Sequence, residues 1–316
     1  MTDPRVVFAG TPEFARASLA ALVDSGLRPQ AVYTQPDRPK GRGRGVAASA
    51  VKEFALEHGL PVRQPVSLKP ADAQQELADF KPDLIIVAAY GLIFPQAVLD
   101  IPRLGCLNVH ASLLPRWRGA APIQAAILAG DTHTGISLMQ MEAGLDTGPV
   151  FATSAIPIGA EETAGELHDR LANLGGELLA EHLHSILARR LPALAQDNAL
   201  ANYAGKIETS DSVLDWRRPA AELARAVRAY SPVPGARFML DDELVKCWTA
   251  SVQDSVTAPA GEIVAAGRDG IDVACAQGVL RLHDVQRAGR RRVSAAEFAA
   301  QRPLAGLSLL AASDSN

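Results

Sequence analysis

Short apolar runs alternate with helical patterns through the first half of the chain. The run Leu84-Ile85-Ile86-Val87-Ala88 contains no polar residue, which is typical of a strand covered on both faces of a sheet. Mostly apolar runs over residues 5–9 and 31–34, and alternation over residues 107–110 and 135–141, predict further strands. Helical patterns follow over residues 13–25, 46–58, 71–80 and 123–128. Strands that alternate with helices at this spacing predict a doubly wound parallel sheet of the α/β class.

The second half of the chain has a different pattern. Thr163-Ala164-Gly165-Glu166 is a capping box that predicts a helix to about residue 189. Residues 192–205 lack strong periodicity, as a linker does. An amphipathic helix is predicted next, over residues 219–230. Short strands are predicted over residues 237–240, 245–249, 261–264, 271–274 and 278–282. Short strands at close spacing, bounded by turn residues, predict a small barrel or sandwich.

Composition limits the class of protein. The chain has 316 residues, 48% of them apolar, and a net charge of −4, so its bulk charge does not indicate a polyanionic partner. The three cysteines are odd in number and widely spaced, which indicates neither a disulfide framework nor a metal site and fits a reducing cytoplasm. No stretch has the pattern of a signal peptide or a membrane span. We therefore expect a cytoplasmic protein with two domains, in which any nucleic-acid contact comes from local patches.

Asn108 and His110 are the most informative polar residues. Side chains two apart on a strand share a face, so both point the same way at the end of a predicted buried strand. Asp146 follows in the Gly-rich segment Gly144-Leu145-Asp146-Thr147-Gly148. An amide, an imidazole and a carboxylate are the groups that acyl transfer needs, for a developing oxyanion and for proton movement. The alternatives are a satisfied buried pair for Asn108 and His110, and an Asx turn for Asp146.

Two further segments each allow two interpretations. Gly41-Arg42-Gly43-Arg44-Gly45 is cationic and glycine-rich, and it either contacts a phosphate backbone or is a solvated loop. The same alternatives apply to Arg290-Arg291-Arg292, near Arg287. Gly10-Thr11-Pro12 follows the first strand but lacks the dinucleotide-binding glycine pattern. It is either a plain turn or a contact point at a helix N-terminus.

Several motifs together resemble a known family. Asn108-x-His110, Ser112-Leu113-Leu114-Pro115 and Asp146 resemble the active site of the folate-dependent formyltransferases. The segments 8–14, 35–43 and 116–123 are similar to the branch of that family that formylates methionyl initiator tRNA. Tyr203-Ala204-x-Lys206-Ile207 and Leu214-Asp215-Trp216 extend the resemblance, which runs from about residue 5 to about residue 310.

The resemblance implies a domain organisation and a reaction. It implies a Rossmann-like formyltransferase domain over residues 1–189, a linker over 190–206, and a tRNA-contacting barrel similar to an OB-fold over 207–316. It implies that 10-formyltetrahydrofolate is the formyl donor and that initiator methionyl-tRNA is the acceptor. The product is then N-formylmethionyl-tRNA for translation initiation. Neither a metal nor an obligate protein partner is implied.

The resemblance also assigns roles to residues. Asn108 and His110 stabilise the oxyanion, while Asp146 orients His110 and helps to move the proton of the amine. Folate contacts fall on Ser112, Leu113, Leu114 and Pro115, and on the backbone near Tyr90 and Gly91. The candidates for tRNA contact are Arg42, Arg44, Lys206, Arg287, Arg290 and Arg291.

Three rival functions use the same residues. The acceptor of the same chemistry is instead a small molecule, such as glycinamide ribonucleotide or an amino sugar nucleotide, or it is water, which makes the protein a hydrolase. In the third, the protein binds a folate or nucleotide as a regulator and does no chemistry. The cationic loop and the second domain disfavour a small acceptor, and the complete set of Asn108, His110 and Asp146 disfavours a regulator.

Overall fold

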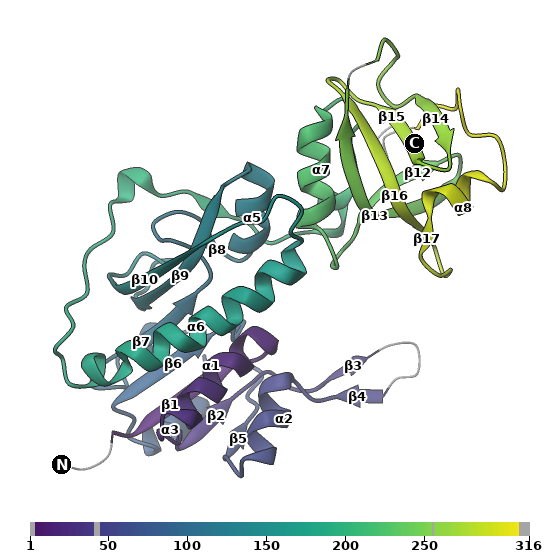
Figure 1. Ribbon diagram of the computed structural model, residues 1–316. Coiled ribbons are helices and arrows are strands. Elements are labelled where there is room, and N and C mark those ends of the chain that lie inside the picture. The colour runs from purple at the N-terminus through teal and green to yellow at the C-terminus, as the bar shows by residue number, and fades with distance from the viewer. Residues whose placement is uncertain (1–3, 41–44, 255, 310–316) are drawn as a thin grey trace. The chain divides into compact units, whose positions relative to one another are not determined.

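The computed structural model describes residues 4–40, 45–254 and 256–309, and contacts divide the chain into two units (Figure 1). Unit 1 comprises Met1–Pro122, His133–Pro157 and His168–Ala204. Unit 2 comprises Ile123–Thr132, Ile158–Leu167 and Gly205–Asn316. Contacts place residues 190–204 in unit 1. The division expected from sequence, 1–189, 190–206 and 207–316, stays a prediction about separate domains.

A seven-stranded sheet forms the centre of unit 1. Its order is β10-β9-β7-β6-β1-β2-β5. The strands are β1 (Val6–Gly10), β2 (Ala31–Tyr33), β5 (Val62–Arg63), β6 (Leu84–Ala88), β7 (Cys106–His110), β9 (His133–Gln140) and β10 (Val150–Pro157). The five strands from β7 to β5 are parallel, whereas β9 pairs antiparallel with β7 and β10 with β9. The predicted doubly wound α/β fold is confirmed, with an antiparallel extension on the side of β7.

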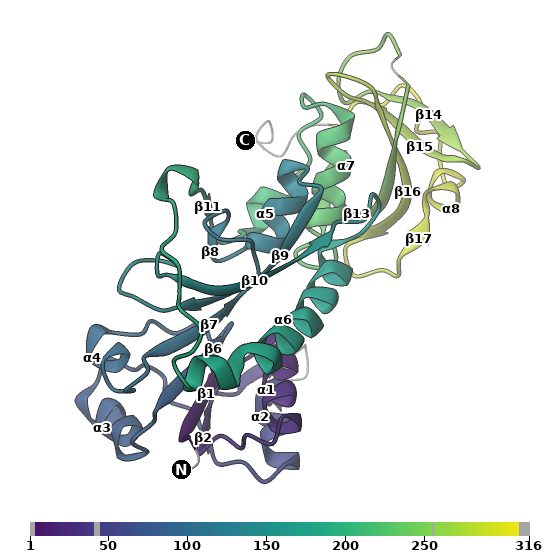
Figure 2. The same cartoon turned by 60° about the vertical axis from the view of Figure 1, so that its left-hand side comes forward.

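Helices cover both faces of this sheet (Figure 2). One face carries α1 (Glu13–Asp24), α2 (Ala50–Glu57) and α6 (Ala164–Leu187), and the other carries α3 (Ala71–Asp79) and α4 (Gln96–Leu99). The α3 and α4 side has a hydrophobic cluster that includes Val7, Ile85, Leu77, Val98 and Cys106. The capping box of α6 is confirmed, because Thr163 N–H donates to Glu166 Oε2 at 2.9 Å and Glu166 N–H donates to Thr163 Oγ1 at 3.3 Å.

The Pro-, Gly- and Arg-rich stretch over residues 35–45, whose composition predicts a loop, contains strand structure. A hairpin pairs β3 (Arg38–Lys40) with β4 (Gly45–Ala47), and α2 begins at Ala50 rather than near residue 46. Ser49 Oγ accepts a hydrogen bond from Lys52 N–H and so caps α2. Pairing across the hairpin therefore overrides the coil preference of its Pro and Gly residues. Arg42 and Arg44 lie outside the described residues.

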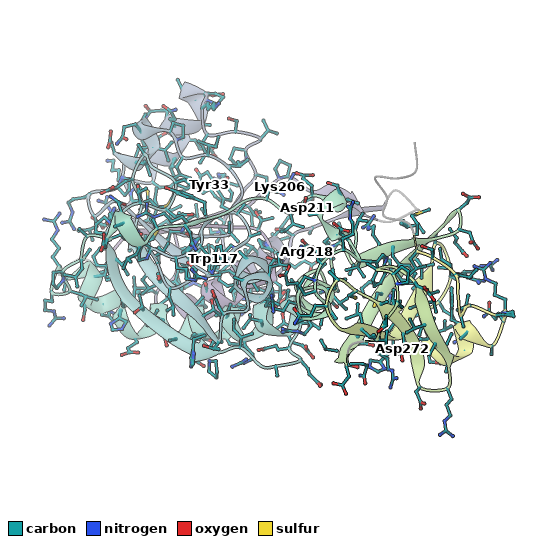
Figure 3. All side chains as sticks on the ribbon, turned by 90° about the horizontal axis from the view of Figure 1, so that it is seen from above. Tyr33, Trp117, Lys206, Asp211, Arg218 and Asp272 are labelled. Atoms are coloured by element: carbon teal, nitrogen blue, oxygen red, sulfur yellow. The ribbon has the colours of Figure 1, made fainter. Side chains whose placement is uncertain are left out.

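Unit 2 is an antiparallel sheet with helices packed against it. Its strands pair in the order β12-β13-β16-β15-β14, with β17 beside β16. They are β12 (Ala236–Leu240), β13 (Glu243–Gln253), β14 (Ile263–Gly267), β15 (Gly270–Ala274), β16 (Val279–Arg287) and β17 (Val293–Ser294). Its core joins residues of α7 (Ala220–Ala229) and α8 (Ala295–Ala299) to Trp216 and Phe238. Figure 3 labels Asp272 on this sheet, where it pairs with Arg281 of the neighbouring strand. The predicted second domain of short antiparallel strands is confirmed.

The remaining elements connect these layers. They are α5 (Pro122–Ala129), the 3₁₀ helices Asn198–Leu200 and Thr209–Ser212, and the strands β8 (Arg118–Gly119) and β11 (Tyr203–Ala204). β8 and β11 pair in parallel, so the stretch predicted as a linker reaches back to the middle of unit 1. Among the residues that the structure describes, no helix has the length and apolar character to cross a bilayer.

Candidate active site

The carboxyl ends of the parallel strands carry the candidate site, and their loops are tied together. Tyr90, after β6, presents its carbonyl to two side chains from neighbouring strand ends. Thr11 Oγ1 donates to it at 3.0 Å and Gln35 Nε2 at 2.9 Å. Thr11, of the Gly10-Thr11-Pro12 turn, thus contributes to a shared edge of the sheet, where α/β folds bind ligands.

The phenol of Tyr90 is buried and its Oη has no hydrogen-bond partner among the described residues. Burial raises the pKa of this phenol above its usual range, so the group is a neutral donor at physiological pH. Gly91 follows with φ +80°, and a side chain there would meet Gln35 Nε2. The structure therefore places both predicted contact residues at the edge of the site.

Asn108 and His110 share a face of β7, as the alternation predicts. Cys106, two residues earlier, packs in the cluster with α3 and α4, whereas Val109 lies against Gly175 of α6. Asn108 is half-buried and its amide has no hydrogen-bond partner among the described residues. An amide held at a strand end without a protein partner is available to a bound molecule. The alternative of a mutually satisfied buried pair is therefore wrong for Asn108.

His110 is held in one orientation by a carbonyl. Its ring is 6% exposed, and Nε2 lies 3.0 Å from the carbonyl oxygen of Trp117 (labelled in Figure 3). A carbonyl only accepts hydrogen bonds, so Nε2 carries the proton. Nδ1 faces Asp146 Oδ2 at 3.7 Å. The imidazole therefore presents Nδ1, together with the carboxylate, for proton exchange.

Asp146 is fixed by a backbone donor from another segment. Its Oδ2 accepts a hydrogen bond from Gly119 N–H at 2.8 Å, so the carboxylate does not form the Asx turn considered as its alternative. Asp146 has a φ of +52°, a left-handed conformation that a non-glycine residue adopts at a cost. Gly119 has a φ of +112°, and a Cβ there would lie 2.5 Å from the carbonyl oxygen of Ala204. Glycine is required there because β8 and β11 approach so closely.

The segment before unit 2 completes the wall of the site. Trp117 N–H donates to Asn202 Oδ1 at 2.6 Å, and Arg118 N–H donates to the Asn202 carbonyl at 3.0 Å. Asn202 thus holds the peptide unit that contains the carbonyl binding His110, and also the peptide unit before it. Sequence patterns do not indicate this role, because Asn202 lies in a stretch without periodicity and 85 residues from Trp117.

The predicted folate loop, Ser112 to Pro115, is held by a serine that the sequence analysis missed. Ser137 of β9 donates from Oγ to the Ser112 carbonyl at 2.7 Å and accepts from Leu114 N–H at 3.0 Å. The buried Ser112 hydroxyl donates to the Arg116 carbonyl at 2.6 Å. The Ser112 side chain therefore shapes the loop, and contacts to a ligand fall to the backbone and to the half-buried Leu113, Leu114 and Pro115.

Of the four cations proposed to contact tRNA that the structure describes, three are already paired with a carboxylate. Lys206 lies 3.3 Å from Glu208, Arg287 3.1 Å from Glu243, and Arg291 2.5 Å from Glu297. The exposed Arg290 has no side-chain partner among the described residues. Within the described part of the chain, no group of three or more His, Cys, Asp or Glu side chains is placed to hold a metal ion.

Comparison with known proteins decides the family. Residues 4–183 match the family model for formyl transferase, and residues 206–303 match that for the formyl transferase C-terminal domain. A methionyl-tRNA formyltransferase of Methylococcus capsulatus is 52% identical over 303 residues, which cover 96% of this chain and 98% of the relative. One from Pseudomonas paraeruginosa is 55% identical over 294 residues, covering 93% and 94%. The chain belongs to the methionyl-tRNA formyltransferase family.

Solved structures share the fold of this formyltransferase at low identity. The N-formyltransferase of Helicobacter canadensis, in complex with folinic acid and dTDP-3-aminofucose, has a TM-score of 0.68 at 15% identity, covering 88% of this chain and 99% of that one. HypX of Aquifex aeolicus, in complex with tetrahydrofolic acid, has a TM-score of 0.62 at 18% identity, covering 95% and 47%. The chain is thus a formyl-transferring enzyme of a family that uses formyl-tetrahydrofolate, and a purely regulatory role is wrong.

The cysteines of this formyltransferase allow a first prediction. Burial raises the pKa of Cys106 and Cys247 to about 12 and that of Cys275 to about 11, so none is a thiolate near neutral pH. We expect iodoacetamide at pH 8 to leave the native enzyme active and unlabelled, while all three thiols react in the urea-unfolded chain. Mass spectrometry of both samples measures this.

Because the folded-state pKa values are raised, the stability that the neutral thiols contribute is complete below about pH 8.5. It is lost as pH rises through 11 to 12. Rapid labelling of native Cys106 with loss of turnover would contradict the prediction.

Proposed function

We propose that this enzyme transfers the formyl group of 10-formyltetrahydrofolate to the α-amino group of initiator methionyl-tRNA, in the cytoplasm. The product is N-formylmethionyl-tRNA for translation initiation. One observation carries the assignment of the site: the amide of Asn108 has no partner in the part of the chain that the structure describes, and it shares a strand face with His110, whose Nδ1 faces Asp146 Oδ2 at 3.7 Å. These residues supply a donor for an oxyanion and a relay for a proton at one place.

The reaction replaces one carbon–nitrogen bond with another. The neutral amine attacks the formyl carbon, a bond forms between that carbon and the amine nitrogen, and the carbonyl oxygen becomes negative. Asn108 donates from Nδ2 to this oxygen. The bond between the formyl carbon and the folate nitrogen then breaks, and the proton of the amine passes to that nitrogen. His110 Nδ1 and the Asp146 carboxylate carry this proton, with water where the distance requires it.

The residues near the strand ends fit a pterin-like ring. Such a ring needs apolar surface together with a few fixed polar groups. The half-buried Leu113, Leu114 and Pro115 offer apolar surface, and the backbone near Tyr90 and Gly91 is the predicted polar contact, while the Tyr90 ring packs in the hydrophobic cluster on the α3 and α4 side. The folate donor supplies the activated formyl group, while the chain supplies its orientation and the proton pathway.

The choice of acceptor is tested directly. We expect release of tetrahydrofolate from 10-formyltetrahydrofolate to be fast only with methionyl-tRNA, because among these acceptors it alone combines an α-amino group with a polyanion that is held at several places at once. The measurement compares rates with methionyl-tRNA, uncharged tRNA, glycinamide ribonucleotide, an amino sugar nucleotide and water alone. Equal or faster release with a small acceptor or with water would overturn the assignment of the acceptor and leave the formyl chemistry intact.

The catalytic assignment predicts the behaviour of three variants. Asn108→Ala, His110→Ala and Asp146→Ala should each lower kcat by about 10² to 10³, the usual cost of losing one oxyanion donor or its support. The losses should not add in double and triple variants, because residues that act as a unit do not add. Asn173→Ala, an exposed amide on α6, serves as the control and should match the wild type. A triple variant that retained near wild-type turnover would remove these residues from the mechanism.

A cationic patch in unit 2, where Arg292 is paired with Asp284 but Arg237 and Lys246 have no carboxylate partner among the described residues, supports the proposal of tRNA binding. Arg237 and Lys246 are directly opposite on β12 and β13, and both donate to the Pro234 carbonyl, at 3.3 and 2.7 Å. Like charges in this position are unfavourable, and burial together with Arg237 lowers the pKa of Lys246. Trp248 lies between cations, with Lys246 Nζ 5.3 Å and the Arg292 guanidinium 6.0 Å from its ring. Trp248 is half-buried, and cations beside a partly accessible ring suit phosphates and unpaired bases. We call this surface the Trp248 patch and place tRNA contacts there, in addition to Arg42, Arg44 and Arg290.

The Trp248 patch predicts a salt-dependent effect. Lys246→Ala and Arg237→Ala should each raise the KM for methionyl-tRNA several-fold and leave the KM for the folate donor unchanged. Each lost phosphate contact should reduce the slope of log affinity against log salt by about 0.7 to 0.9. The control is Arg268→Ala, which removes an exposed cation that lies 3.7 Å from Asp269. Binding of tRNA at several salt concentrations measures the slopes, and unchanged slopes in both variants would exclude the patch.

A further inference from the structure

Gln196 uses its whole carboxamide to join two loops of the active site. Its Oε1 accepts hydrogen bonds from Arg118 Nε at 3.1 Å and from Arg118 Nη2 at 2.9 Å. Its Nε2 donates to the carbonyls of Asp146 at 2.9 Å and Gly148 at 2.7 Å. Arginine only donates and carbonyls only accept, so the orientation of the amide is fixed by its surroundings. All four hydrogen-bonding positions of the side chain are occupied.

Both of these loops lead to a catalytic group. On one side, Arg118 stands between Trp117, whose carbonyl holds His110 Nε2, and Gly119, whose N–H holds Asp146 Oδ2. On the other side, Gln196 donates a hydrogen bond to the backbone carbonyl of Asp146 itself. The residue therefore connects the support of the imidazole to the support of the carboxylate.

The buried charge of Arg118 bears on why residue 196 is a glutamine and not a glutamate. Arg118 is 2% exposed, and its guanidinium is bonded to the amides of Gln196 and Asn198, with no paired carboxylate among the described residues. Burying a cation costs free energy unless an opposite charge accompanies it. A glutamate at position 196 has the same length and would neutralise Arg118. It would also place a carboxylate oxygen against the carbonyls of Asp146 and Gly148, which then lose their donor. Pairing with Arg118 alone thus favours glutamate, whereas holding the Asp146 loop requires glutamine.

We infer that Gln196 is a positioning residue for formyl transfer, which fixes the Asp146 carboxylate relative to His110. Asp146 has a left-handed backbone, and such a conformation persists only where its surroundings hold it. Gly119 N–H holds one end of the residue and Gln196 holds its carbonyl. The inference rests on the catalytic role of Asp146 proposed above.

Gln196→Glu separates positioning from support of the fold. We expect kcat to fall about 10- to 100-fold, since small displacements of reacting groups have effects of this size. The KM values for folate donor and methionyl-tRNA should change less than about twofold, because the interaction serves the transition state. The thermal midpoint should change little, because the new pair with Arg118 offsets the lost hydrogen bonds to the Asp146 and Gly148 carbonyls. A structural role predicts instead that activity follows stability.

Two more variants complete the comparison. Asn198→Ala removes a bond to the same Arg118 guanidinium, 2.8 Å from Nη2, without touching the Asp146 loop, and should keep wild-type kcat. Gln196→Ala should lower kcat as Gln196→Glu does, and it also removes the support of Arg118. A kcat for Gln196→Glu equal to that of the wild type would overturn the inference, as would a loss of the same size in Asn198→Ala.

A double-mutant cycle tests the route of the effect. In an Asp146→Asn background, Gln196→Glu should lower kcat little further, because the two residues act on one group. An equal loss in both backgrounds would overturn the inference while leaving Asp146 in its role. Wild-type turnover in Asp146→Asn alone would instead overturn the proposed role of Asp146, so the two failures are distinguishable.

Discussion

Backbone groups that leave the sheet where β6 and β7 end must still be hydrogen-bonded, and the active site is built around that requirement. The carbonyl of Tyr90 is satisfied by Thr11 and Gln35, and the carbonyl of Ser112 by Ser137. These hydrogen-bond partners lie on other strands or at their ends. The bonds that satisfy the two carbonyls therefore also hold the loops after the strands together. The side-chain amide of Asn108 on β7 differs from these backbone groups, since it has no partner among the described residues. Polar groups that are fixed but unused are what a substrate needs.

Local patterns predict the parts of the molecule that depend on neighbours in sequence. The apolar run over residues 84–88 and the alternation over 107–110 correspond to β6 and β7, and Thr163 with Glu166 forms the expected cap. The common face of Asn108 and His110 also follows from alternation alone. By contrast, β10 is half-exposed along its length and gives no clear apolar signal, and β3 and β4 are three-residue strands within a Pro- and Gly-rich stretch.

The support of the site is not visible in the sequence. Gln196 and Asn202 lie 78 and 85 residues from the partners they hold, and nothing local distinguishes them from other amides in a stretch without periodicity. The positions of cationic residues in the sequence are likewise not enough to predict the tRNA contacts. The sequence shows that Lys206, Arg287 and Arg291 are cationic, but not that each has a carboxylate beside it. Arg237 and Lys246 were not singled out by sequence, because only strand pairing brings them opposite each other.

The pairing of β8 with β11 has a consequence for the order in which the molecule is made. The sheet strands of unit 1, with Asn108, His110 and Asp146, are all synthesised before residue 160. Residues 196–202, which hydrogen-bond to Trp117, Arg118 and Asp146, are synthesised only after the 24 residues of α6. A nascent chain can therefore assemble its sheet while its reactive groups are still loosely held. The active site becomes complete only when residues 196–204 have left the ribosome, so folding and competence are separate events in the life of each chain.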